Sequence, residues 1–117
     1  MSPESPESHL PLTPLSYQIL VALAGRPRHG YAIIKEIEER EGGATVPSTG
    51  ALYLALQRME ADGLIGPAEA PVDETDGRRR YYRLTELGRE VAAAESARLA
   101  GLVDAARSRK LLPGSGR

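Results

Sequence analysis

A basic ribbon that follows a compact helical segment is the feature that most constrains this chain. In the ribbon, Gly77–Leu84, a turn-forming glycine precedes three consecutive arginines and an alternating strand. The helical segment Ser48–Leu56 precedes it at a spacing typical of one supersecondary unit. A β-ribbon that presents cations suits a phosphate backbone, and the segment before it has the size and patterning of a recognition helix. The two elements together predict a winged helix-turn-helix.

Charge is polarised along the chain, although the overall balance is slightly acidic. The formal net charge is −1 over 117 residues, which by itself weighs against nucleic-acid binding. Residues 77–89 nevertheless contain five arginines and one glutamate, a local net charge of +4, while acidic residues gather in 36–41. A local basic stripe of this kind is the electrostatic signature of a surface that contacts nucleic acid.

Composition excludes several classes of protein. The chain has no cysteine, so it has neither disulfides nor thiolate metal sites, and we expect a cytoplasmic protein. No apolar run is long enough to cross a bilayer, and residues 1–8 lack the pattern of a signal peptide. Two histidines without ligand spacing predict no metal site or cofactor. Since no nucleophile, base and orienting group come together, we expect no enzymatic activity.

The chain divides into four predicted parts. Residues 1–11 are rich in Pro, Ser and Glu and are expected to be a disordered arm. Residues 12–84 form the winged helix-turn-helix domain, and residues 85–107 form a C-terminal dimerisation helix. Residues 108–117 are expected to be a disordered tail. The predicted fold is therefore mostly α-helical, with a small β-wing and one helix added at the C-terminus.

Capping residues and apolar periodicity locate the elements within the domain. The first helix is predicted over 14–24, the second from about Tyr31 to Glu41, and the third from a Ser48 cap to about Asp62. A short edge strand begins at Leu64, and the return strand runs from Arg79 to Leu84.

The surface predicted to bind DNA combines the outward side of the third helix with the second helix and the wing. Tyr53 has two possible roles, a semi-buried core residue or a contact to phosphate or base. Leu54 either touches a thymine methyl group or is an ordinary exposed leucine. The arginines either bind phosphates or form a solvated turn. The predicted DNA-binding residues are Tyr31, Lys35, Ser48, Thr49, Gly50, Tyr53, Leu54, Gln57, Arg58, Arg78, Arg79 and Arg80.

The last helix carries an apolar stripe that the small domain leaves uncovered. The stripe could pack back on its own domain, but after a complete three-helix core it more often marks a partner surface. Major-groove readers also commonly dimerise across two half-sites. With help from the first helix, the predicted dimer-interface residues are Leu15, Ile19, Val91, Leu99, Leu102, Val103 and Ala106.

An ordered set of short motifs resembles the PadR-like transcriptional regulators. The motifs, which extend over about residues 12–107, are Leu12–Leu15, His29–Tyr31, Ser48–Tyr53, Glu60–Ile65 and Arg80–Arg89. The resemblance is to the short subfamily with a single C-terminal helix. It implies a homodimeric winged-helix repressor that a small-molecule effector releases from double-stranded operator DNA.

This sequence departs from the family pattern at three points. Ala51 stands where the family usually has Thr, and Leu54 where it often has Pro or Arg. The chain also has no Trp and no Phe, so drug stacking between tryptophans, known in one branch, is unavailable here. The effector stays unidentified. The alternative function is a winged-helix adaptor that binds proteins and not DNA, which the slightly acidic balance favours.

Overall fold

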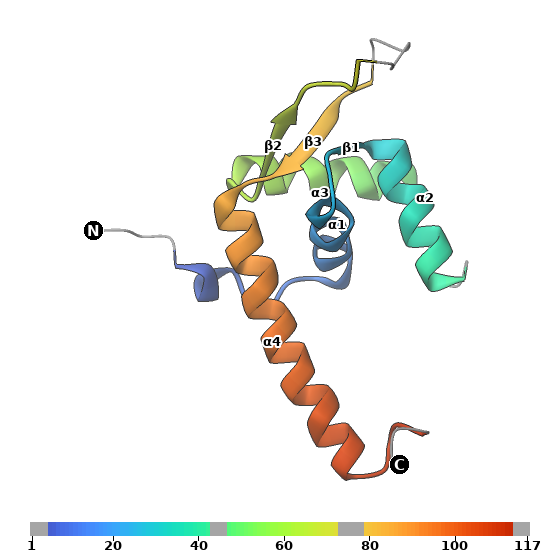
Figure 1. The fold of residues 1–117 in the computed structure, drawn as a ribbon, viewed down its shortest axis with the longest axis vertical. Helices are drawn as coiled ribbons and strands as arrows, with labels where there is room; N and C mark the ends of the chain where they lie inside the picture. The colour runs from blue at the N-terminus through green and yellow to red at the C-terminus, as the bar shows by residue number, and fades with distance from the viewer. Residues whose placement is uncertain (1–4, 43–46, 73–78, 114–117) are drawn as a thin grey trace.

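The computed structural model describes residues 5–42, 47–72 and 79–113, and confirms a mostly helical chain with a three-stranded sheet (Figure 1). A 3₁₀ turn, η1, precedes the domain, and α4 follows the sheet. The elements in chain order are η1 (Pro6–His9), α1 (Pro14–Ala24), β1 (Arg28–His29), α2 (Gly30–Glu41), α3 (Thr49–Ala61), β2 (Ile65–Ala68), β3 (Tyr81–Leu84) and α4 (Glu86–Ser108).

Side-chain caps begin the helices where the sequence predicts them. Thr13, Ser48 and Thr85 each accept a hydrogen bond from the backbone N–H three residues ahead, at the starts of α1, α3 and α4. His29 caps α2 in the same way, since its Nδ1 accepts from the Ala32 N–H at 3.1 Å. The predicted bounds of the first three helices are therefore confirmed to within one residue.

The sheet is antiparallel with the order β1-β3-β2, so β3 lies in the middle. Its partners are β1, through the pair Arg28 and Tyr82, and β2, through the pair Ile65 and Leu84. The β2 and β3 ribbon was predicted, although β3 begins at Tyr81 and not at Arg79. The two-residue β1 was not, because a strand of that length has no periodicity to detect.

A single core forms around α1, which packs against α2, α3, α4 and β3 (Figure 1). α4 contributes to it mainly through its first turns. The core side chains with at most 1% exposure include Ile19, Leu20, Ile33, Ile37, Leu52, Leu56 and Val91. Two of these, Ile19 and Val91, were predicted to contact a second chain. That prediction is wrong for both, because each has 0% exposure inside one chain.

The segment before α1 is folded where disorder was expected. From Ser5 onward the described residues include η1, which packs against α4. Leu10 and Leu12 pack against the core. The prediction of a disordered arm over 1–11 is therefore wrong for this part, because η1 packs against α4 and Leu10 packs against the core.

The start of α4 is fixed to the end of α3 and the beginning of β2. The Thr85 hydroxyl donates to the carbonyl oxygens of Gly63 and Leu64, at 2.6 and 3.0 Å. A side chain at Gly88 would place its Cβ 2.0 Å from the Leu64 carbonyl oxygen, so only glycine permits this approach. Beyond its middle, α4 extends away from the domain (Figure 1). No helix in the described ranges is long and apolar enough to cross a membrane.

Candidate nucleic-acid interface

A concave surface lies where the N-terminus of α2, the outer side of α3 and the beginning of β3 meet. Its volume is about 810 Å³ and we call it the groove. It collects predicted DNA-binding residues from three separate elements. The groove is lined by His29, Gly30, Tyr31, Gly50, Tyr53, Leu54, Gln57, Glu60, Arg79, Arg80 and Tyr82.

The outer side of α3 supplies the floor of the groove. Leu52, Leu56 and Met59 turn into the core, which leaves Tyr53 and Leu54 outside, with exposures of 43% and 52%. The first alternative for Tyr53, a semi-buried core residue, is therefore wrong, and the exposed position of Leu54 is compatible with either of its two roles.

The Tyr53 ring can lie against the start of α2 because Gly30 has no side chain. A Cβ on Gly30 would lie 2.4 Å from the Tyr53 hydroxyl oxygen and 2.7 Å from its Cζ. The ring therefore occupies the space of a missing side chain. The glycine of the His29–Tyr31 motif thus has a direct steric reason in this chain.

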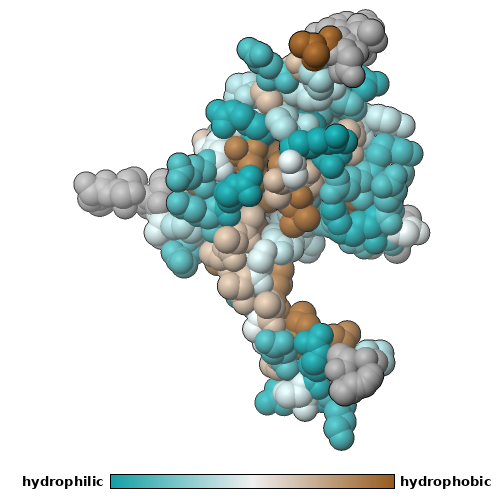
Figure 2. Space-filling view, in the orientation of Figure 1, coloured by the Kyte–Doolittle hydropathy of each residue, from teal (hydrophilic) through white to brown (hydrophobic). Residues whose placement is uncertain are grey.

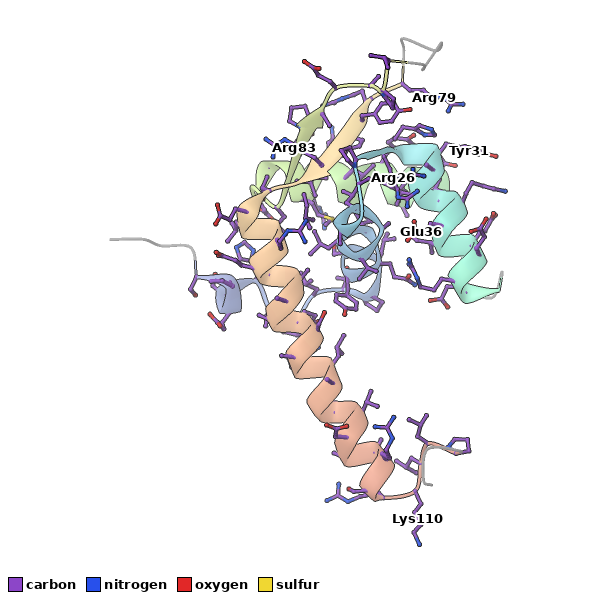
Figure 3. All side chains as sticks on the ribbon, in the orientation of Figure 1. Arg26, Tyr31, Glu36, Arg79, Arg83 and Lys110 are labelled. Atoms are coloured by element: carbon purple, nitrogen blue, oxygen red, sulfur yellow. The ribbon has the colours of Figure 1, made fainter. Side chains whose placement is uncertain are left out.

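α2 contributes an aromatic and a cation beside the groove. Tyr31 is 55% exposed and points outward (Figure 3). The Lys35 Nζ lies 5.9 Å from the centre of the Tyr31 ring and 3.3 Å from a Glu38 carboxylate oxygen. The hydrogen bond that Lys35 donates to the Glu38 carboxylate raises the pKa of Lys35. Lys35 itself does not line the groove.

The wing arginines enter the groove from the two residues immediately before β3. The Arg79 Nη1 lies 2.8 Å from the His29 Nε2, and Arg79 points to the α2 side of the ribbon (Figure 3). Arg80 lies 5.4 Å above the centre of the Tyr82 ring. Arg78, the third predicted arginine, lies outside the described residues. Arg83 lies within β3 and extends to the other side of the ribbon (Figure 3).

Four lining residues were not among those predicted to bind DNA: Gly30, discussed above, and His29, Glu60 and Tyr82. His29 was read only as part of a motif and as a histidine without ligand spacing, yet its ring lies near those of Tyr31 and Tyr81, with centroid distances of 6.3 and 5.2 Å. Glu60 was read as part of a motif, but its carboxylate accepts from Arg80. Tyr82 is buried, which raises the pKa of its hydroxyl. The i, i+3 spacing of Glu60 from Gln57 was the one available signal, since it places both on one side of a helix.

The remaining predicted residues flank the groove without lining it. Thr49 and Arg58 are exposed on α3. Ser48 is exposed too, and its hydroxyl oxygen is already used, at 3.0 Å, by the Ala51 N–H. The groove itself carries guanidinium groups, phenol groups and the amide of Gln57. Within the described ranges no cluster of three or more His, Asp or Glu side chains could hold a metal ion.

A second exposed surface lies on the distal half of α4. Figure 2 shows hydrophobic side chains near the C-terminal end of this helix, apart from the body of the domain. Leu102 and Val103 have exposures of 57% and 43%. Leu99 and Ala106 are half-buried, as is Leu15 on α1, which packs against the core. Of the predicted interface, these five residues stay at or near the surface.

Comparisons with known proteins point to one family. The model of the transcriptional regulator PadR-like family matches residues 19–94. A Streptomyces fradiae protein, named as an uncharacterized 37.1 kDa protein in transposon TN4556, is 44% identical over 88 residues. This match covers 73% of the chain and 24% of that relative, so the chain spans a minor part of the relative's length.

Solved structures resemble the whole arrangement. The crystal structure of a PadR family transcription regulator from Clostridium difficile R20291 has a TM-score of 0.68 and 28% identity, covering 80% of this chain and 95% of that one. Bacillus subtilis PadR, solved in complex with operator DNA, has a TM-score of 0.58 and 24% identity, covering 68% of this chain and 45% of that one. The second likeness shows a shared fold.

Proposed function

The chain belongs to the PadR-like family of transcriptional regulators, and on that basis we propose that it is a homodimeric repressor that binds a specific operator. One observation carries this proposal. The groove brings the outer residues of α3 and the arginines just before β3 onto one continuous surface. A helix that reads base edges and a basic ribbon that contacts the backbone are the two parts that sequence-specific DNA binding requires.

Within the groove we assign sequence preference to α3 and affinity to the wing. Gln57 is exposed and carries an amide, which bonds in two places to adenine. Tyr53 and Leu54 lie on the same side and supply a hydroxyl and an apolar contact. Arg79 and Arg80 neutralise phosphates and read no sequence. Bacillus subtilis PadR, which shares this fold, is solved with operator DNA and supports the proposal.

The second part of the proposal is a two-fold dimer through α4. Leu102 and Val103 are exposed on the part of α4 that projects beyond the domain, and we propose that a second copy of the chain buries them. Two recognition helices then reach half-sites one turn of DNA apart, roughly 34–36 Å. A monomer would offer one half-site only, and its affinity would fall accordingly.

The third part of the proposal is a small-molecule effector that releases the dimer from its operator. A cavity of about 490 Å³ lies beside α1 and α4, with Leu12, Tyr17, Val21 and Leu99 among its lining residues. Because Leu99 belongs to the proposed interface, a ligand here would alter how two copies meet and thereby the spacing of the two α3 helices. The protein acts where its DNA lies, in the cytoplasm of the cell.

The test is a binding measurement with the DNA upstream of the chain's own gene. Fluorescence anisotropy compares that DNA with a random duplex of equal length, for the wild type and for Gln57→Ala. The proposal predicts tighter binding of the upstream DNA by the wild type, and a loss of roughly 1–3 kcal/mol of discrimination in the variant. Equal, weak binding of both duplexes would favour the protein-protein adaptor.

A further inference from the structure

One carboxylate stands inside a groove that is otherwise suited to an anionic partner. Glu60 lies in the last turn of α3 and lines the groove together with Gln57, Tyr53 and both described wing arginines. Its side chain is 30% exposed, so the charge is neither buried nor remote from a ligand in the groove. DNA approaching this surface would meet a negative group among the cations.

Glu60 is paired with Arg80. The Arg80 Nη2 lies 3.3 Å from the Glu60 Oε2 and 3.5 Å from its Oε1, so one guanidinium nitrogen is shared by both carboxylate oxygens. The guanidinium carbon also lies over the Tyr82 ring, 5.4 Å from its centre. Arg80 still keeps 63% of its side chain exposed. Its position is thus defined from two sides, while it remains accessible to DNA.

A carboxylate and a phosphate compete for the same donors. Both are anions that accept hydrogen bonds from the fork of an arginine side chain. When Arg80 turns fully to a phosphate, Glu60 loses its partner and stays beside a polyanion. Every duplex must displace this contact, whatever its sequence, because phosphates are common to all DNA.

We infer that Glu60 is a positioning residue that mimics a phosphate: it holds Arg80 over Tyr82 in the free protein and weakens the binding of all DNA. The inference rests on the proposed function, and deepens it by naming a built-in competitor for one wing arginine. An exposed ion pair is a weak contact, so the competitor moderates binding and does not prevent it. Release from DNA is thereby faster.

The central experiment removes the charge at position 60 and keeps the shape. Glu60→Gln should bind the chain's upstream duplex and a random duplex more tightly by a similar factor, about two- to five-fold, the range that an exposed ion pair supports. The slope of log affinity against log salt should steepen by up to about one unit, because one more net cation faces the DNA. Glu60→Ala should change both quantities in the same direction.

Two comparisons separate this role from a general charge effect. Glu90→Gln makes the same change in net charge at an exposed site on α4 outside the groove, and should leave affinity and slope unchanged. The second comparison repeats Glu60→Gln in an Arg80→Gln background, where the gain in affinity should shrink. Circular dichroism of each variant checks that the fold is intact.

The outcomes distinguish the inference from the function on which it rests. If the wild type binds neither duplex, the proposed DNA-binding function fails. If the wild type binds but Glu60→Gln behaves like Glu90→Gln, the role of Glu60 is refuted and DNA binding stands. An equal gain with and without Arg80 would also overturn the inference, since Glu60 would then act by long-range repulsion alone.

Discussion

At the scale of single residues, the contact between Gly30 and Tyr53 fixes the geometry of the groove. Gly30 opens α2 and has no side chain, so the Tyr53 ring packs against its backbone. The atoms that would clash with a Cβ are the hydroxyl oxygen, Cζ and Cε1 of Tyr53, the far end of an exposed side chain. The Tyr53 ring can therefore rotate away from a Cβ added at Gly30. It would then leave the position in the groove from which we propose that it contacts DNA.

Gly30→Ala should therefore affect DNA binding more than stability. We expect a change in unfolding free energy within about 1 kcal/mol, because alanine is favourable in a helix and offsets part of the steric cost. Operator affinity should fall because Tyr53 is displaced. Thermal melts and anisotropy measure the two effects. Gly25→Ala is the matched control, since a Cβ there meets nothing within 4 Å; a larger loss of affinity in Gly25→Ala than in Gly30→Ala would contradict the assignment.

At the scale of elements, a buried carboxylate joins α4 to the segment before α1. Glu95 has 1% exposure and accepts from the Leu12 N–H at 3.0 Å. Arg98 donates to both of its oxygens, at 2.7 and 3.0 Å. Nearby, the hydroxyl oxygens of Tyr17 and Ser96 lie 2.6 Å apart. These polar contacts hold α1 and its N-terminal extension against the middle of α4, where the helix leaves the domain.

This cluster predicts an acid-sensitive link between the two elements. The hydrogen bond from Arg98, and then the one from the Leu12 amide, lower the pKa of Glu95 from its ordinary value of 4.5, although burial opposes them. A lowered pKa means that the stabilisation is fully present above 4.5 and is lost as the pH falls through the folded value.

The measurement is a series of thermal melts from neutral to acid pH. Glu95→Gln should melt below the wild type at neutral pH, and the difference should shrink once the pH falls below 4.5. Glu90→Gln, an exposed change in the same helix, should show no such dependence. A gap between the Glu95→Gln and wild-type curves that stays constant across the whole pH range would refute the link.

The same elements show what the sequence could and could not predict. Local signals predicted α1, α2, α3 and the β2–β3 ribbon, because caps such as Thr13 and Ser48 and the apolar periodicity act within a few residues. β1 and η1 were missed, since their formation depends on contacts with β3 and α4 that lie far away in the sequence.

Pairings between distant charged or polar groups were equally invisible. Glu60 and Arg80 are separated by 20 positions, and Leu12 and Glu95 by 83. Ile19 was mistaken for an interface residue because a periodic stripe says which face of a helix is apolar, but not whether its own chain already covers that face. The residues that α3 contributes to the groove were mostly predicted, because the helical period says which side chains point away from the core.

At the scale of the whole molecule, the chain is less compact than its length allows. Its radius of gyration is 16.0 Å, whereas a compact domain of this length would have about 13.4 Å. The excess comes from α4, which projects beyond the body of the domain (Figure 1). The exposed Leu102 and Val103 on this projection are what a second copy would cover in the proposed dimer.

Leu102→Glu combined with Val103→Glu should give a folded monomer. Both side chains are exposed in the single chain, so the domain loses little, while a dimer would have to bury unpaired carboxylates. Sedimentation at micromolar concentration should give a mass near twice 12.6 kDa for the wild type and near 12.6 kDa for the variant. Ala97→Glu, exposed on the opposite side of α4, is the control and should stay dimeric. A monomeric wild type would contradict the dimer.

The salt dependence of DNA binding tests the central claim most directly, that the groove is where this regulator meets the DNA backbone. Arg79→Ala with Arg80→Ala removes two cations from the groove, and Arg83→Ala removes one from the other side of the same ribbon. With about 0.9 unit of slope for each phosphate contact, the double variant should lose up to roughly two units of the log–log slope, and should bind upstream and random DNA more weakly. Arg83→Ala should match the wild type. A double variant with the wild-type slope, or an equal loss in Arg83→Ala, would contradict the account.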